Sequence, residues 1–377
     1  VKSLIHALST ASNLTRANMV GLFKALDISI SKATVINMST KELDKLEQEH
    51  LEAFIASIES SPITHIDDTG ARHEGRNCST TVVSTDSVAL FNTSESKSRL
   101  NAINVLGGAQ GLKFLIDDGA IEYIKAHRIK TIHADRVKTL GNRLIESEEE
   151  LESELNRLNL TGKGTQRTIK EALALSHLKS YGPRHRALMS DAAKQFIDLF
   201  KDHSNCWFHE NKHYKEFIVV SDPEKEELAR VREGFKDFFQ ELKAYKLSPS
   251  EELAKELEDK FDELVTQDVK NPALRNQLKQ TQLRKDLLLL VLKLPDIPLT
   301  NNEVERDIRK KVQKRKISFG TRSEAGKKAR DLMMSLAISC RKLDVSIIEF
   351  LLDRLQELNQ LPSLAQIVRT RASPVLA

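Results

Sequence analysis

The sequence predicts a helix-rich α/β protein built around one small mixed sheet that helical insertions interrupt. Strand-like patterns are confined to residues 63–93 and 186–208, and long charged helical patterns separate and follow them. Aromatic residues, which are enriched in strands, make up only 5% of the 377 residues. One sheet with inserted helices fits this order better than separate α and β domains.

The first 60 residues predict a small helical region. Residues 17–26 have a short helical pattern, residues 27–29 form a turn, and Ser31 is placed to cap a second helix. Helix, tight turn and helix form the outline of a helix-turn-helix, and an ordinary helical hairpin fits the same pattern. A longer amphipathic helix follows at residues 41–60. We therefore expect residues 1–60 to be a helical, DNA-binding-like region.

Two strand patches supply the expected sheet. In the first, a strand ends at Asp67, Thr69 and Gly70 form a turn, and two β-branched strands flank a hairpin turn at residues 85–87. In the second, a short strand runs into Asp191. The expected divisions after the N-terminal region are a first part of the core at 61–110, a mostly helical insertion at 111–185, a second part of the core at 186–221, a helical insertion at 222–297, a third part with C-terminal helices at 298–358, and a tail at 359–377.

Positive charge is concentrated in one C-terminal segment. The whole chain has a formal net charge of only +4, but the segment from Thr300 to Arg330 contains eleven Lys and Arg against four Asp and Glu. A local basic surface of this kind is the electrostatic signature of nucleic-acid binding. Most basic runs are simply solvated faces, so the charge alone does not identify a partner.

The cysteine and hydropathy patterns favour a cytoplasmic protein. Cys78, Cys206 and Cys340 are scattered and odd in number, so they form no disulfide framework and fit a reducing compartment. The N-terminal residues lack the apolar core of a secretory signal, and the longest apolar run, residues 287–292, is too short to span a bilayer. We expect no membrane partner.

Three acidic residues stand where elements of the expected core begin or end. Asp67 and Asp191 each end a predicted strand, and Glu305 lies near the start of a predicted helix. With a helical period of 3.6 residues, Glu305 shares one face with Ile308 and Val312. This apolar face is expected to pack on the sheet, so that Glu305 points towards the strand ends.

Three converging carboxylates predict a two-metal site. Hard cations such as Mg²⁺ and Mn²⁺ prefer oxygen ligands. Two such ions activate an attacking water or 3′-hydroxyl and stabilise the leaving oxygen of a phosphodiester. A structural interpretation competes, because Thr300 with Glu303 and Asn302 with Glu305 both have the spacing of a helix capping box.

Several segments together resemble those of one family of bacterial mobile-element enzymes. They are HIDDTG (65–70), LMSDAAKQF (188–196), CWFHENKHYKEF (206–217) and TNNEVERDIRKKVQKRKISFGTRSEAG (300–326). In this order they resemble the characteristic segments of the insertion-sequence-66-type transposases, a DDE family. GLFKALDISISKATV (21–35) is also similar to the segment that precedes the family's catalytic domain. The resemblance covers most of the chain, from about residue 17 to 352.

The resemblance implies a ribonuclease-H-like catalytic core and a DNA transposase. Asp67, Asp191 and Glu305 match the family's catalytic acids, which would hold two Mg²⁺ or Mn²⁺ ions. The implied reaction is hydrolysis at the 3′ ends of the element, followed by attack of the 3′-hydroxyls on target DNA. The implied partners are double-stranded DNA, further copies of the chain in a homodimer or higher oligomer on that DNA, and accessory proteins. The place of action is the bacterial cytoplasm, at the nucleoid. The residues expected to bind DNA phosphates are Arg306, Arg309, Arg315, Lys316 and Arg322.

Two positions leave the choice of acids open. Asp68 stands where the family usually has Glu, so either acid of the pair Asp67 and Asp68 could bind metal. Asp118, followed by Gly119, is a rival for the second acid. Asp191 is preferred because Cys206 follows it at the short distance typical of the family.

The segment that begins at Cys206 has two interpretations. Cys206 and His209 have half of a zinc spacing, and His213 adds a third potential ligand. A closed structural zinc site needs four ligands, so zinc is not expected, and we expect Cys206 and His209 to be packed and hydrogen-bonded near the active site. Trp207, the only tryptophan, either packs in the core or stacks on an unpaired DNA base.

Two other functions fit the same fold. One is a catalytically inactive DNA-binding descendant, and the other is a nuclease that cuts DNA without joining ends. The intact set of three acids favours an active transposase over the first alternative.

Overall fold

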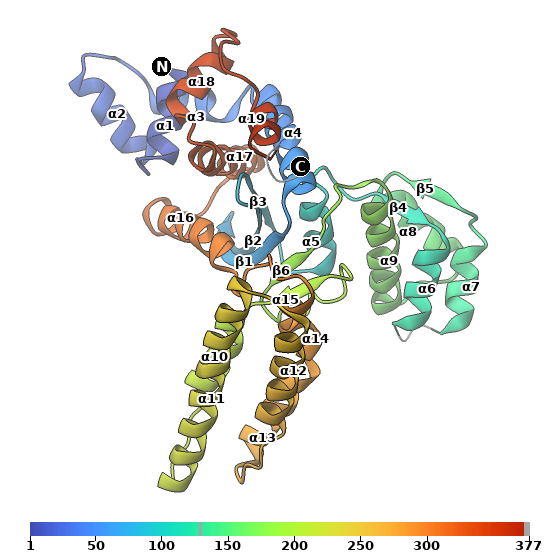
Figure 1. Ribbon diagram of the computed structural model, residues 1–377. Helices are drawn as coiled ribbons and strands as arrows, with labels where there is room; N and C mark the ends of the chain where they lie inside the picture. Colours follow the sequence, from blue (N-terminus) through green and yellow to red (C-terminus); the bar gives the residue numbers. More distant parts are fainter. Residues whose placement is uncertain (128–129, 373–377) are drawn as a thin grey trace. The chain divides into compact units, whose positions relative to one another are not determined.

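The computed structural model describes residues 1–127 and 130–372, which divide into two compact units (Figure 1). Unit 1 contains the N-terminal helices, most of the first strand patch and the C-terminal helices. Unit 2 contains the second strand patch and the helices that follow it. The boundaries are Val1–Ser61, Asp67–His185 and Arg306–Ala377 for unit 1, and Pro62–Ile66 and Arg186–Glu305 for unit 2.

Five strands form a mixed sheet with the order β3-β2-β1-β6-β7. β2 and β3 pair antiparallel, whereas β6 pairs in parallel with both β1 and β7. The predicted helix-rich α/β architecture with a mixed sheet is therefore confirmed. The strands are β1 (Thr64–His73), β2 (Arg76–Ser84), β3 (Ala89–Ser94), β6 (Leu188–Ser190) and β7 (His203–Asn205).

The first strand is longer than predicted. Asp67 was expected to end it and Thr69 with Gly70 to form the turn, but β1 continues to His73. The turn lies at Glu74 and Gly75, whose φ angles are 50° and 78°. Two central residues with positive φ form the tight hairpin turn that matches strand twist. The prediction failed because Gly70 was taken as the turn glycine in place of Gly75.

Four helices form the N-terminal region of unit 1. The predicted helices are present, and the side chain of Ser31 caps α3 by accepting the N–H of Thr34 at 3.0 Å. A small core of Ile5, Met19 and Phe23 joins the first two helices. The helices are α1 (Lys2–Thr10), α2 (Arg16–Ala25), α3 (Lys32–Thr40) and α4 (Asp44–Ser60).

The insertion between the strand patches is mostly helical, as expected. It also contains a two-stranded antiparallel sheet of β4 (Phe114–Ile116) and β5 (Arg143–Ile145), which lies outside the two predicted strand patches. Strands of three residues are too short to produce a recognisable alternation. The helices from the end of β3 to the end of the insertion are α5 (Arg99–Leu106), α6 (Asp118–Ala126), α7 (Thr131–Lys138), α8 (Glu148–Arg157) and α9 (Lys163–Tyr181).

Unit 2 is helical after β7. Its core is rich in aromatic side chains, among them Trp207, Tyr214, Phe235 and Phe261. The stacked rings of Tyr214 and Phe235, 4.4 Å apart, join the first two helices. The helices are α10 (Trp207–Lys215), α11 (Asp222–Leu247), α12 (Glu251–Thr266), α13 (Pro272–Leu283), α14 (Lys285–Leu288) and α15 (Leu290–Lys293).

The last four helices are α16 (Asn302–Ser318), α17 (Glu324–Lys342), α18 (Ile347–Leu355) and α19 (Leu364–Ala372). The expected tail thus contains a helix, and only residues 373–377 of it lie outside the described residues. Leu364 and Val368 of α19 are buried, and the N–H of Leu364 donates to Glu49 of α4 at 3.2 Å. Among the described residues, no helix has the length and hydropathy needed to cross a bilayer.

Helix α17 covers the exposed edge of β3 with a polar stripe. Asp331, Ser335 and Ser339 follow one another at a spacing of four residues and therefore lie on one helix face. They accept the backbone N–H groups of alternate residues of β3, which are Thr93 at 2.7 Å, Phe91 at 2.9 Å and Ala89 at 3.1 Å. The stripe satisfies N–H groups that an edge strand otherwise leaves unpaired.

The acid of this stripe also forms a buried ion pair. Lys311 Nζ lies 2.5 Å from Asp331 Oδ1, and both side chains are at most 9% exposed. Burial lowers the pKa of Lys311, and the charge of Asp331 opposes that shift. The pair therefore gives the buried Lys311 an acidic partner inside unit 1.

We predict that Asp331→Ala destabilises unit 1 by about 3–5 kcal/mol, because it leaves a buried ammonium unpaired. The matched control is Glu146→Ala, which removes an exposed pair with Lys113 in the same unit and should cost less than about 1 kcal/mol. Urea unfolding followed by far-ultraviolet circular dichroism measures both. Equal effects of the two substitutions would contradict the structural role of Asp331.

Candidate active site

Asp67 lies on β1 and Asp191 directly follows β6, and these two strands pair in parallel. Thr64 and His65 of β1 pair with Leu188 and Met189 of β6, which lie 124 positions later in the sequence. Asp191 also lies 124 positions after Asp67. Asp191 follows the last residue of β6, and Asp67 follows the part of β1 that belongs to unit 2.

The structure distinguishes the two adjacent acids of β1. Thr81 donates its hydroxyl hydrogen to Asp68 Oδ1, and Asn101 Nδ2 donates to Thr81 Oγ1 at 2.6 Å. Successive side chains of a strand point to opposite faces, so Asp67 faces away from Thr81 and Asn101. Asp67 Oδ1 accepts the N–H of Asp68 at 2.6 Å, and Asp67, on the face opposite Thr81, stays our candidate acid of the pair.

Asp191 lies in a turn that hydrogen bonds hold in place. Its Oδ1 accepts the N–H of Ala193 at 3.0 Å, and its carbonyl accepts the hydroxyl of Ser190 at 2.5 Å. Ser190 Oγ lies 2.8 Å from His203 Nε2. Burial lowers the pKa of His203 to about 4, so the ring is neutral at pH 7. Because Ser190 already donates its only hydroxyl hydrogen, Nε2 of His203 carries the proton.

The rival acid Asp118 occupies the first position of α6. The preceding residue, Asp117, caps this helix by accepting the N–H of Ala120 at 2.8 Å. β4, which leads into α6, pairs with β5 and does not belong to the five-stranded sheet. The Asp118 side chain is 77% exposed and pairs with Lys138. These surroundings explain Asp118 as a helix-start residue, and Asp191 remains our choice.

Asn301 fixes the start of α16 within unit 2. Its buried side chain accepts from Nδ1 of His65 at 2.8 Å and donates through Nδ2 to the carbonyl of Ile66 at 3.0 Å. Its backbone N–H donates to Cys206 Sγ at 3.2 Å, and its carbonyl accepts the N–H of Glu305 at 3.2 Å. One residue thus links the end of the paired part of β1, the start of α10 and the first turn of α16.

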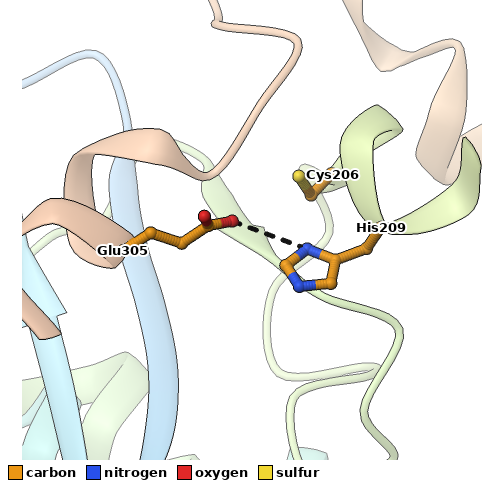
Figure 2. Close-up of side chains that lie close together, drawn as sticks. All are labelled: Cys206, His209 and Glu305. Carbon is orange, nitrogen blue, oxygen red and sulfur yellow. Dashed lines mark ion pairs between the residues drawn. The ribbon is translucent and has the colours of Figure 1, made fainter. Parts of the chain in front are cut away.

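Glu305 faces the first turn of α10. Figure 2 shows its carboxylate directed towards His209, with Cys206 on the same helix start. Glu305 Oε1 lies 3.8 Å from His209 Nδ1, within ion-pair distance when the ring is protonated, and Oε1 is buried without a hydrogen-bond partner. The pKa of His209 is raised, chiefly by a hydrogen bond with the Cys206 side chain. Burial of the ring lowers the pKa, and the negative charges of Cys206, Glu305 and Asp191 raise it.

The residues around Glu305 fit a divalent cation. A buried carboxylate oxygen without a hydrogen-bond partner is unusual in a folded protein, and either the protonated ring of His209 or a bound cation would balance its charge. Ligand atoms of Cys206, His209 and Glu305 lie within 4.8 Å of one another. Cys206 Sγ already accepts the N–H of Asn301, so Glu305 is the member of this group that best fits an oxygen-preferring ion. α16 begins at Asn302, so Asn302 lies inside the helix and does not stand at the N-cap position of a capping box with Glu305.

The buried face of α16 is not the face that was predicted. The stripe Val304, Asp307, Lys311 and Lys314 is buried, whereas Glu305, Ile308 and Val312 are half-buried. The stripe is mainly charged, and each charge has a partner. Asp307 pairs with Lys342 at 2.9 Å, Lys311 pairs with Asp331, and Lys314 donates to the carbonyl of Ser9. A hydrophobic pattern assigns charged residues to the exposed face of a helix, so it does not predict a buried face made of ion pairs.

The five cations expected to bind DNA differ in their surroundings. Arg315 is half-buried, and its Nη1 donates to the carbonyl of Gly70, so it also holds β1. Lys311 and Lys314 of the same basic segment are buried and do not add to the surface. The other four expected cations are exposed, namely Arg306, Arg309, Lys316 and Arg322.

Trp207 belongs to the core, so its proposed contact with a DNA base is wrong. The residue is 0% exposed, and its indole N–H donates to the carbonyl of Leu288 at 2.9 Å. Phe238 and Phe261 pack against the ring at 5.4 Å and 6.2 Å between centroids. No face of the indole is available for stacking.

Asn301 is the site residue that the sequence interpretation missed. It lies inside the segment TNNEVER, which was examined for its acids and for its helix cap only. The available signal was a pair of amides directly before a helix that carries a candidate catalytic acid. Its contacts with His65 and Ile66 are more than 230 positions away in the sequence and cannot be inferred from local spacing.

Comparisons with known proteins relate this chain to a family of transposases. Residues 165–329 match the family described as "Transposase IS66 family". This segment contains Asp191, Cys206, His209, Asn301 and Glu305, and it does not reach Asp67. A protein of Sinorhizobium fredii (strain NBRC 101917 / NGR234), described as the uncharacterized protein y4jO, is 32% identical over 309 residues. The alignment covers 80% of this chain and 94% of that protein.

We predict that Asn301→Ala destabilises unit 2 by about 1–3 kcal/mol, because His65 and the carbonyl of Ile66 lose their buried partner. The only tryptophan, Trp207, lies in the core of unit 2, so urea unfolding followed by its fluorescence reports on this unit. Asn302→Ala, at the exposed neighbouring position, is the matched control and should change the free energy of unfolding by less than about 0.5 kcal/mol. Indistinguishable midpoints for the two variants would refute the linking role of Asn301.

Proposed function

This chain belongs to the IS66 transposase family, and we propose on that basis that it is the DNA transposase of a bacterial insertion sequence. It cleaves DNA at the 3′ ends of the element and joins those ends to target DNA. Asp67, Asp191 and Glu305 are the acids of the reaction. The observation that carries the proposal is the buried carboxylate oxygen of Glu305 that has no hydrogen-bond partner, in the segment that matches the family.

The proposed catalytic core is ribonuclease-H-like. The mixed five-stranded sheet supports it, because Asp67 lies on β1 and Asp191 directly follows β6, which pairs in parallel with β1. The third acid comes from the first turn of α16, which Asn301 holds beside the start of α10. Acids delivered by strands and by a fixed helix start are positioned by rigid elements, as catalysis requires.

Asp67, Asp191 and Glu305 are the residues that would hold two Mg²⁺ or Mn²⁺ ions. When bound, these ions supply activation of the attacking water or 3′-hydroxyl and stabilisation of the leaving oxygen. The chain contributes the negative charge that attracts the cations. Asp191 and Glu305 also place negative charge near His209 and help to keep its proton bound.

DNA is the proposed macromolecular partner. The exposed cations Arg306, Arg309, Lys316 and Arg322 follow Glu305 in the sequence and would bind phosphates without reading sequence. The helices α2 and α3, joined by a short turn, are proposed to read the ends of the element as a helix-turn-helix. Because both ends of an element have to be cut, we propose that at least two copies of the chain act together on DNA, with accessory proteins as further partners. This assembly would work on the nucleoid in the cytoplasm.

We predict that Glu305→Gln abolishes strand cleavage and strand transfer and preserves DNA binding. The amide keeps the size of the side chain and removes the charge that a cation needs. Duplexes taken from the DNA that flanks the gene, incubated with Mg²⁺ or Mn²⁺, provide the substrate, and labelled products separated on a denaturing gel provide the measurement. Glu303→Gln, two residues away on the same helix, is the matched control and should remain active.

The same assay separates the competing functions. Cleavage without joined products would identify a nuclease, and DNA binding without any metal-dependent product would identify an inactive descendant. Wild-type activity of the Glu305→Gln variant would exclude Glu305 as a catalytic acid.

We predict that Arg309→Gln weakens DNA binding equally for all DNA sequences. The slope of the logarithm of affinity against the logarithm of salt concentration should fall by about 0.9, because one fewer phosphate is neutralised. Lys255→Gln makes the same change of charge at an exposed position of α12 and should leave the slope unchanged. Fluorescence anisotropy over a series of salt concentrations measures both. An unchanged slope for Arg309→Gln would remove this residue from the DNA contact.

A further inference from the structure

We propose that Phe319 stacks on an unpaired base of the DNA substrate, in a site bordered by arginine and lysine side chains. The inference rests on the proposed function, because it assumes that DNA is the substrate. It adds an aromatic contact at the C-terminal end of α16, all within unit 1.

Phe319 is exposed, and its backbone conformation is unfavourable for a bulky residue. The residue is 76% exposed, although burial of its ring would be favourable. Its φ angle is 52°, in the left-handed region that bulky residues rarely adopt. It is the only aromatic residue among the described non-glycine residues with positive φ. Helices commonly end in glycine at this position, and here glycine follows one residue later, at Gly320.

The backbone around Phe319 is held rigidly. Its N–H donates to the carbonyl of Arg315 at 2.9 Å, and its carbonyl accepts Nη1 of Arg330 at 2.8 Å. Two residues later, Thr321 donates to the carbonyl of Arg72 at 3.1 Å and accepts the N–H of Glu74 at 2.8 Å. The ring is therefore presented from a fixed loop.

Gly320 allows this close approach to β1. A Cβ at this position would lie 2.6 Å from the carbonyl oxygen of Arg72, which is closer than van der Waals contact permits. The chain thus places glycine where the backbone has to pass β1 and phenylalanine where the side chain points outwards. Strained conformations that surrounding contacts hold in place are typical of functional sites.

Positive charge surrounds the ring. Phe319 lines a hollow of about 10 Å³ together with Arg72, Arg315, Lys327 and Arg330. This volume suffices for no more than a water molecule, so an occupant has to lie over the ring and not inside the hollow. The acid at the start of α17, Glu324, is already paired with His73 at 2.9 Å and with Lys327 at 2.8 Å.

An aromatic ring among cations is the arrangement that binds unpaired nucleotides. The cations attract the phosphates, and the ring stacks on a base irrespective of its identity. The charge of the site excludes a basic partner and complements DNA. Ends of DNA that are being cut and joined supply unpaired bases, so this site would act on the substrate of the proposed reaction.

The test compares wild type with Phe319→Gly and Phe319→Trp. Two labelled probes are used, a fully paired duplex and the same duplex with a single-stranded 3′ overhang, with affinities from fluorescence anisotropy. We expect Phe319→Gly to lower the affinity for the overhang about tenfold and the affinity for the paired duplex less than twofold. We expect Phe319→Trp to keep the affinity, and the emission of the new tryptophan to be quenched on binding. Trp207 is buried, so wild type supplies the background signal.

A structural role of Phe319 predicts a different result. Glycine adopts positive φ without strain, so Phe319→Gly should melt at or above the wild-type temperature while it loses affinity for the overhang. Ile317→Ala is the matched control, since Ile317 is 47% exposed in the same segment, and it should bind both probes as wild type does.

Unchanged affinity of Phe319→Gly for the overhang, with no quenching in Phe319→Trp, would overturn the inference and leave the proposed function intact. A change in sedimentation of Phe319→Gly at unchanged DNA affinity would also overturn it, because the ring would then contact a second copy of the chain. Failure of wild type to bind either probe would instead contradict the proposed function.

Discussion

The hydrogen bonds of Asn301 are the constraint on which the proposed site depends. Its side chain holds His65 and the carbonyl of Ile66, directly before Asp67. Its backbone holds Cys206 at the start of α10 and Glu305 in the first turn of α16. A carboxamide suits this place because it offers a donor and an acceptor on one short side chain. Any apolar residue at this place would remove both side-chain hydrogen bonds from these buried polar groups.

A second constraint comes from charge that is buried and paired in unit 1. Asp331 accepts a backbone hydrogen bond from the edge strand β3 and forms an ion pair with Lys311 of α16. Asp307 of α16 accepts a hydrogen bond from Ser84 at 2.7 Å and forms an ion pair with Lys342. These contacts fix α16 by polar interactions as well as by apolar packing. The helix that carries Glu305 and the exposed arginines is therefore anchored within unit 1 along its later turns.

The sequence predicted the elements better than their contacts. Helical periods and the cap of α3 are local properties, so the helices and the mixed α/β class could be inferred. The end of β1 was misplaced because Gly70 and Gly75 give the same turn signal, and only pairing decides between them. The buried face of α16 was predicted wrongly because Lys311 and Lys314 are buried although they are charged. Trp207 and Phe319 show the same limit, since only the fold reveals which aromatic ring is covered.

The claim that Asp67, Asp191 and Glu305 hold cations together is tested most directly by anomalous diffraction from crystals of the chain with DNA and Mn²⁺. The account predicts two manganese peaks, each bound by carboxylate oxygens of these three residues. A single peak on Cys206 and His209, or no peak at the three acids while the DNA is bound, would contradict it.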